Sequence, residues 1–152
     1  WLIMPEDEVS AVRAGWNAIK MDEVDILYSI FKAYPDIQAR FPKFVNKDLD
    51  ALKDTASFAL HATRIVGLFS EFIALLGPEG NQPAIKTILN EMGQNHRNRG
   101  ITKELFNEFR AGLTTYVKGH SAWNDNASKS WDDAFDKMYY VIFSALDGKP
   151  VH

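Results

Sequence analysis

The sequence predicts an all-α protein, and three observations support this. Apolar residues recur three or four positions apart along most of the chain, which is the spacing of one face of an α-helix. No stretch longer than a few residues alternates between apolar and polar side chains as a half-buried strand does. Glycine and proline residues separate the periodic stretches. Because the chain has 152 residues, of which 46% are apolar and 24% charged, we expect six or more helices in a single domain spanning residues 1–152.

The first two helices are expected at residues 5–19 and 22–34. Pro5 is followed by three acidic residues, and this combination favours the start of a helix. Asp22 can cap the second helix, and Pro35 ends it because the proline ring clashes with a continuing helix. The apolar faces of these two helices consist of Val9, Val12, Trp16, Ile19, Val24, Leu27, Phe31 and Tyr34.

The segment from Asp36 to Asp50 is expected to form a short helical turn and a bend. It contains Pro42, and it places Phe41 and Phe44 three positions apart. Connections between helices are mostly polar and lie at the surface. Two phenylalanines in such a connection therefore predict packing against another part of the molecule.

The longest predicted helix runs from about Leu49 to Leu76, and residues 77–80 interrupt it. His61 borders its apolar face, and Ile65 lies one turn further on, over the same surface. The face itself repeats at helical spacing and consists of Phe58, Ala62, Ile65 and Phe69.

Three further helices are predicted in the second half of the chain. The first covers Gln82 to about Asn95, so that His96 stands at a helix end beside a polar, basic turn. Thr102 can cap the next helix. The last helix carries an apolar face as far as Leu146 and closes at Gly148.

Composition excludes several classes of function. The formal net charge is −3 and no run of Lys or Arg occurs, which argues against a nucleic-acid partner. The longest uninterrupted apolar run is far shorter than the ~20 residues that span a bilayer, so no membrane partner is expected. The chain has no cysteine, which rules out disulfides, thiolate metal sites and thiol catalysis.

Two of the four histidines, His61 and His96, lie on predicted helices with an apolar face. They stand 35 positions apart (96 − 61) and no HExxH motif accompanies them, so they do not form a helical zinc pair. Iron in a porphyrin needs less from the protein, because the macrocycle supplies the equatorial nitrogens and one axial histidine is enough. The residues alone leave two simpler readings open: a core histidine bonded to a backbone carbonyl at position 61, and an exposed helix-end histidine at position 96. A haem would also need apolar walls and nearby cations, for which the candidates are Phe41, Phe44, Ile65, Arg64, Arg97 and Arg99.

The chain resembles the globin family, and most closely the haemoglobins of midge larvae. The stretches that carry the resemblance are YPDIQARF with FPKF, then FALHATRIVGLFSEF, NHRNRGIT and FRAGLTTYVK. The order Pro35, Phe41, His61, His96 with these spacings is more specific than any one piece, and the resemblance covers about residues 8–146. It implies a globin fold of about seven to eight helices around a haem pocket, packed pairwise at roughly 50°.

The resemblance also implies roles for individual residues. His96 matches the proximal ligand that binds the iron of haem b (protoporphyrin IX iron). His61 matches the distal histidine that donates a hydrogen bond to bound dioxygen, and Leu27 and Ile65 match residues lining the same side. Phe41 matches the phenylalanine that stacks on the haem. The other haem contacts that we expect are Phe44, Arg64, Met92, Arg99 and Ile101.

The function implied is reversible dioxygen binding at a ferrous haem, for transport or storage, with no enzymatic activity. Carbon monoxide and nitric oxide are expected as further ligands, and the oligomeric state is expected to be a monomer or a weak homodimer. Extracellular placement in the haemolymph is implied by resemblance only. Two alternatives stay open: a haem enzyme, such as a peroxidase or nitric oxide dioxygenase, and a six-coordinate sensor with His61 also on the iron.

One departure from the family pattern concerns residues 77–83. This loop between the central helix and the helix that carries His96 is roughly six residues longer than in typical relatives. Lengthening a surface loop costs little free energy. We therefore expect the extra length to bulge outward and to leave the position of His96 unchanged.

Overall fold

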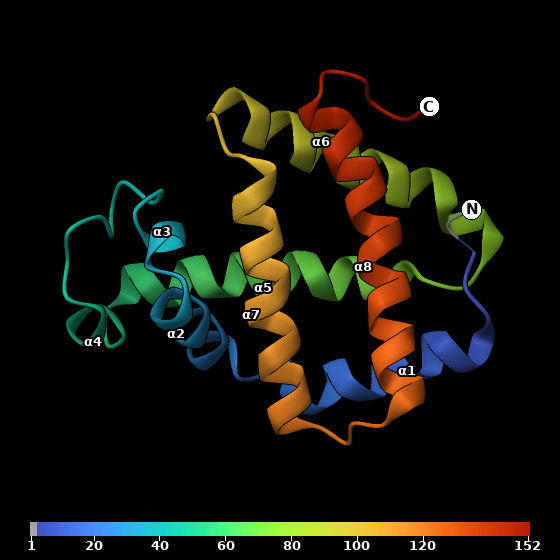
Figure 1. The fold of residues 1–152 in the computed structure, drawn as a ribbon, viewed down its shortest axis with the longest axis horizontal. Coiled ribbons are helices and arrows are strands. Elements are labelled where there is room, and N and C mark those ends of the chain that lie inside the picture. The colour runs from blue at the N-terminus through green and yellow to red at the C-terminus, as the bar shows by residue number, and fades with distance from the viewer. Residues whose placement is uncertain (1–2) are drawn as a thin grey trace.

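The computed structural model describes residues 3–152, and within them the fold contains eight α-helices, one 3₁₀ helix and no strand (Figure 1). The all-α prediction is confirmed. The helices are α1 (Glu6–Ile19), α2 (Glu23–Ala33), α3 (Pro35–Gln38), α4 (Leu49–Leu52), α5 (Ala56–Leu75), η1 (Glu79–Asn81), α6 (Gln82–Asn98), α7 (Lys103–His120) and α8 (Asp125–Leu146).

Long helices cross one another around one hydrophobic core. In Figure 1, α7 and α8 lie beside each other, α5 runs across them, and α6 and α1 cross opposite ends of α8. The crossing of α6 and α8 requires a glycine. A Cβ built on Gly93 would lie 2.5 Å from Ala145 Cβ and 2.7 Å from the Ile142 carbonyl oxygen. The helix that carries His96 is therefore packed backbone against backbone on α8.

The prediction of one helix from Leu49 to Leu76 is wrong at its start. The segment forms two helices, α4 and α5, because Thr55 takes an extended conformation and its hydroxyl accepts a hydrogen bond from the Phe58 N–H at 3.2 Å. A threonine in this position caps a new helix rather than continuing an old one. Asp48 caps α4 in the same way.

Two other predicted caps have different outcomes. Thr102 caps α7 by accepting from the Leu105 N–H at 3.4 Å, as expected. The prediction for Asp22 is wrong, because its side chain makes no cap hydrogen bond to α2. Its carboxylate instead accepts from the Tyr116 hydroxyl at 3.1 Å, so it joins the start of α2 to α7.

The connection between α5 and α6 is a short structured turn. It contains η1, and α6 begins at Gln82 with Pro83 in its first turn. The Asn81 side-chain amide donates to the Leu75 carbonyl oxygen at 3.2 Å. This bond ties the turn to the C-terminal end of α5. Residues 77–80 are exposed, and an outward bulge of the extra length stays a prediction.

Candidate functional site

His96 lies in the last turn of α6, with its ring half-buried. Its Nδ1 is 2.7 Å from the Met92 carbonyl oxygen. A carbonyl can only accept, so Nδ1 carries the proton, and Nε2 of the neutral ring keeps its lone pair. Burial lowers the pKa of His96, the bond to Met92 opposes this, and the nearby charge of Arg99 lowers it further. The neutral ring, which is the form that binds a metal, is therefore favoured.

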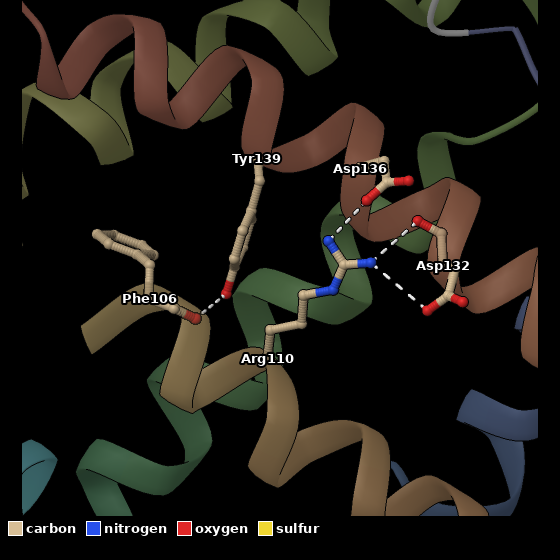
Figure 2. Close-up of polar contacts among 5 residues, drawn as sticks. All are labelled: Phe106, Arg110, Asp132, Asp136 and Tyr139. Atoms are coloured by element: carbon tan, nitrogen blue, oxygen red, sulfur yellow. Dashed lines mark hydrogen bonds and ion pairs between the residues drawn. The ribbon is translucent and has the colours of Figure 1, made fainter. Parts of the chain in front are cut away.

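A second contact restricts His96 from the side. The ring of Phe106, on α7, lies edge-on to the imidazole with centroids 5.1 Å apart. The Phe106 carbonyl oxygen accepts a hydrogen bond from the Tyr139 hydroxyl on α8 (Figure 2). The imidazole is thus held by its own helix and by a ring from a neighbouring helix.

His61 lies in the second turn of α5, against the two phenylalanines of the preceding connection. Its ring centroid is 4.8 Å from that of Phe44 and 5.9 Å from that of Phe41, both edge-on. The Phe44 side chain is 0% exposed and Phe41 is half-buried, so the prediction that both pack inward is confirmed. The ring centroid of Phe31, on α2, lies 5.3 Å from that of Phe41 and 6.1 Å from that of Phe44.

The hydrogen bond of His61 has a consequence for its chemistry. Its Nδ1 lies 2.9 Å from the Ser57 carbonyl oxygen, so in the neutral ring the other nitrogen, Nε2, is an acceptor. His120, which is exposed, makes the same bond to the Tyr116 carbonyl at 2.9 Å. This bond to the carbonyl four residues earlier is therefore a local feature of helical histidines and does not by itself indicate a function. A hydrogen bond donated from Nε2 would need the ring to leave Ser57.

The surroundings of the two histidines meet at one end of the molecule. Arg40, which precedes Phe41, donates from Nη2 to the carbonyl oxygens of Arg99 and Gly100 at 3.0 and 3.4 Å. Arg99 lies about one helical turn after His96 in the sequence. The bend that packs on His61 is thus bonded directly to the turn that follows His96.

Apolar surface that the chain leaves partly uncovered lies beside both histidines. The helix α5 has a mean hydropathy of 1.4 over its most apolar window, yet only 33% of that window is buried. By length and composition alone it is the one described helix that could cross a membrane, but here it runs through the core and contacts α1, α2 and α6. Half-buried apolar side chains lie on α5, at Ile65, and on other elements, at Phe41, Met92, Ile101, Phe106 and Phe109.

The remaining candidate residues differ in how accessible they are. Leu27 is 1% exposed and lies inside the core with Phe44. Arg64 and Arg99 are exposed cations on α5 and just after α6. Arg97 extends over Gly148, where a Cβ would clash with its guanidinium Nη1. Of the three candidate arginines, Arg97 is therefore the one whose guanidinium lies against the C-terminal segment.

These residues fit a haem better than a bare metal ion. Within residues 3–152, no group of three or more His, Cys, Asp and Glu side chains could hold a metal. One neutral histidine with a free Nε2, bordered by uncovered apolar rings, instead suits an iron whose other ligands come from a flat apolar macrocycle. The exposed arginines are suited to its propionates.

Comparisons with known proteins identify the family. The Globin family model matches residues 24–142. The chain is a globin. It is 56% identical to globin CTT-X of Chironomus thummi thummi over 147 residues, which are 97% of each chain. It is 51% identical to globin CTT-Z of Chironomus thummi piger, with 94% of this chain and 88% of that one covered.

Solved structures agree with this assignment. A hemoglobin component (TA-VII) of Tokunagayusurika akamusi superposes with a TM-score of 0.92 at 46% identity, covering 95% of this chain and 97% of that one. A hexa-coordinate hemoglobin of Drosophila melanogaster superposes with a TM-score of 0.86 at 27% identity, covering 96% and 97%. The predicted globin fold and the resemblance to midge haemoglobins are confirmed, and the family implies a haem cofactor.

The sequence reasoning missed two residues of this globin that shape the site. Tyr139 supports Phe106, and Arg40 joins the bend before α4 to the turn after α6. Tyr139 did carry a signal, because a tyrosine within an apolar helix face needs a partner for its hydroxyl. Arg40 carried none, since its partners are main-chain carbonyls that any residue could have supplied.

Proposed function

We propose that this globin binds haem b and carries or stores dioxygen reversibly, without enzymatic turnover. The observation that supports the proposal most directly is the half-buried imidazole of His96, whose Nδ1–H is committed to Met92 and whose Nε2 is left to bind iron. When bound, the haem supplies a ferrous iron that takes dioxygen reversibly. All other contributions come from the residues of the chain.

On the proximal side, His96 would be the iron ligand. The hydrogen bond to Met92 fixes its tautomer and raises the basicity of Nε2. Met92 and Ile101 would pack against the macrocycle, and Phe41 would stack on it. Arg64 and Arg99 would pair with the propionates, and Phe44 would support the haem indirectly, because it is closed inside the core behind Phe41 and His61.

On the distal side, His61 would hold dioxygen by donating a hydrogen bond from Nε2. To do so, the ring must exchange its bond to Ser57 for one to the gas. A hydrogen bond of this kind contributes ~1–2 kcal/mol, or about a tenfold change in affinity. Ile65 and, behind it, Leu27 would keep water away, which strengthens the bond by lowering the local dielectric.

The hydrogen bond of His61 also favours a second candidate state. With Nδ1–H donated to Ser57, Nε2 of His61 is a potential second axial ligand. A six-coordinate iron would then be the resting form, as in the Drosophila relative described as hexa-coordinate. The absorption spectrum of the ferrous, gas-free protein separates the two, because five- and six-coordinate haems differ in that state.

The test is reconstitution with haem, compared across three variants. The wild-type protein should give a reversible oxy spectrum in its ferrous form. His96→Gly should lose normal haem binding, and His61→Leu should keep the haem but release dioxygen about tenfold faster. His120→Gly is the matched control, since His120 makes the same backbone bond but is exposed on α7. A normal oxy spectrum in His96→Gly would contradict the proposal.

The wider setting is proposed from the relatives alone. Its similarity to midge globins supports an extracellular protein of the haemolymph, a monomer or weak homodimer, that also binds carbon monoxide and nitric oxide. Steady turnover of peroxide would instead favour the enzyme alternative.

A further inference from the structure

Tyr139 is a buried residue of α8 that contacts Phe106 in two ways. Its hydroxyl donates to the Phe106 carbonyl oxygen, and its ring meets the Phe106 ring edge-on with centroids 5.8 Å apart (Figure 2). Phe106 in turn lies against the His96 ring at 5.1 Å. Three side chains therefore connect α8, α7 and α6 in series, with the proposed iron ligand at the end.

The tyrosine hydroxyl lies beside the backbone of α7. Burial raises the pKa of Tyr139 well above its ordinary value, and the charge and the backbone N–H of Arg110 oppose this rise. In a regular helix the N–H of residue 110 would bond to the carbonyl of residue 106. The hydroxyl thus lies at the turn that carries Phe106, and its one hydrogen bond goes to the carbonyl oxygen of that residue.

The side chain of Arg110 fixes the same turn to α8. It donates to Asp136 at 2.8 Å and approaches Asp132 at 3.5 Å. The guanidinium also lies 5.2 Å from the Phe135 ring centroid and 5.9 Å from that of Tyr139 (Figure 2). These carboxylates are exposed, so the ion pairs add little stability. Their effect is geometric, because they hold α7 in register with α8 next to Tyr139.

We propose that Tyr139 is a positioning residue for the iron ligand: by fixing Phe106, it sets the orientation of the His96 imidazole. The inference rests on the proposed role of His96. One hydrogen bond, to Met92, leaves an imidazole free to rock about that bond, and the edge of Phe106 limits this motion from the side. Groups that orient a metal-bound histidine are known to change affinity when they are removed.

The chain offers a closely matched control in Tyr116. It too is a buried tyrosine, 6% exposed against 5% for Tyr139, and its hydroxyl also makes one hydrogen bond. That bond goes to Asp22, and its ring stacks on His120 at 3.9 Å rather than on a residue that touches His96. Removing either hydroxyl costs one hydrogen bond, and the loss at Tyr116 is at least as large because its acceptor is a carboxylate. Only Tyr139 contacts a residue that touches His96.

The experiment compares Tyr139→Phe with Tyr116→Phe in the haem-loaded protein. The main readout is the iron–histidine stretching band in the resonance Raman spectrum of the ferrous, gas-free form. Tyr139→Phe should shift and broaden this band and speed haem release about two- to fivefold. Tyr116→Phe should leave the band unchanged, although it also loses a hydrogen bond and unfolding free energy.

A second pair of variants keeps the test decisive. Phe106→Leu should shift the band in the same direction, and adding Tyr139→Phe to it should give no further shift, because the intermediate ring is already gone. An unchanged band in Tyr139→Phe, or equal shifts in both tyrosine variants, would overturn the inference alone. A missing band that did not return when His61→Leu removed the candidate second ligand would instead contradict the proposed function.

Discussion

The two histidine regions are held by different kinds of contact. Around His96, the main chain itself is fixed: Gly93 brings α6 against the Ile142 carbonyl of α8. The Asn90 side chain then bonds to both the N–H and the carbonyl of Val151, at 3.0 and 2.6 Å. Around His61, the contacts are aromatic side chains from a connection between helices, chiefly Phe44.

This difference suits the two proposed tasks. A ligand that anchors iron must keep its position, and close-packed backbones have few alternative arrangements. A distal histidine must exchange hydrogen-bond partners when gas enters, and neighbouring side chains can adjust more readily than helices can. We therefore expect substitutions near His96 to act through helix position, and those near His61 to act through local packing.

The largest expected effect comes from emptying the packing around His61. Phe44→Ala should lower the unfolding free energy by about 3–5 kcal/mol, because a fully buried ring leaves a cavity. It should also speed dioxygen release, while the iron–histidine band stays unchanged.

Phe72→Ala is the control: Phe72 is 2% exposed on α5, but no ring contact joins it to His61. It should cost similar stability in chemical denaturation with no effect on gas release. If Phe44→Ala and Phe72→Ala released dioxygen at the same rate, packing around His61 would have no specific effect on gas binding, and the contrast with the surroundings of His96 would fail.

A smaller effect, on the other side, is expected from Gly93→Ala. The added Cβ would lie 2.5 Å from Ala145 Cβ, so α6 must move away from α8. Overpacking of this kind costs about 1–3 kcal/mol. The displaced helix should also shift the iron–histidine band, which Phe44→Ala should not do.

Gly67→Ala supplies the control for that prediction. Gly67 also lies within a long helix, α5, but nothing lies within 4 Å of a Cβ built there. Alanine should therefore stabilise the protein by about 0.5–1 kcal/mol through helix propensity alone. If both glycine substitutions changed stability with the same sign, the close approach of α6 and α8 would not be what Gly93 provides.

Sequence reasoning predicted most of the helices and selected His61 and His96 as candidate site residues, because both depend on local sequence patterns. Apolar spacing outlined each helix face, and Pro5, Thr102 and the glycines near helix ends gave most of the boundaries. The break at Thr55 was missed because a threonine between two stretches of helical spacing does not by itself distinguish a cap from a helical position. The role of Asp22 was missed for a different reason, since its partner, Tyr116, is 94 positions away.

The contacts that fix His96 could not be predicted in the same way. Gly93 and Asn90 gave no sequence signal, because each matters only through the distance between α6 and a segment about 50 or more positions further on. Periodicity describes which face of a helix is buried, but it does not state how closely two backbones approach. The surroundings of His96, where two helix backbones approach most closely, are thus the part of the molecule that the sequence predicts least well.

The smallest expected effect concerns the bond between α6 and residues 148–152. Asn90→Ala removes both hydrogen bonds to Val151 and should lower the unfolding free energy by about 1–2 kcal/mol. Asn90→Asp should lose less, because its carboxylate can still accept from the Val151 N–H while the bond to the carbonyl is gone. Amide hydrogen exchange at Val151 should rise strongly in Asn90→Ala and only slightly in Asn90→Asp, with haem release following the same order. If exchange at Val151 rose while haem release stayed at the wild-type rate in both variants, the C-terminal segment would be bound to α6 without helping to hold His96 in place.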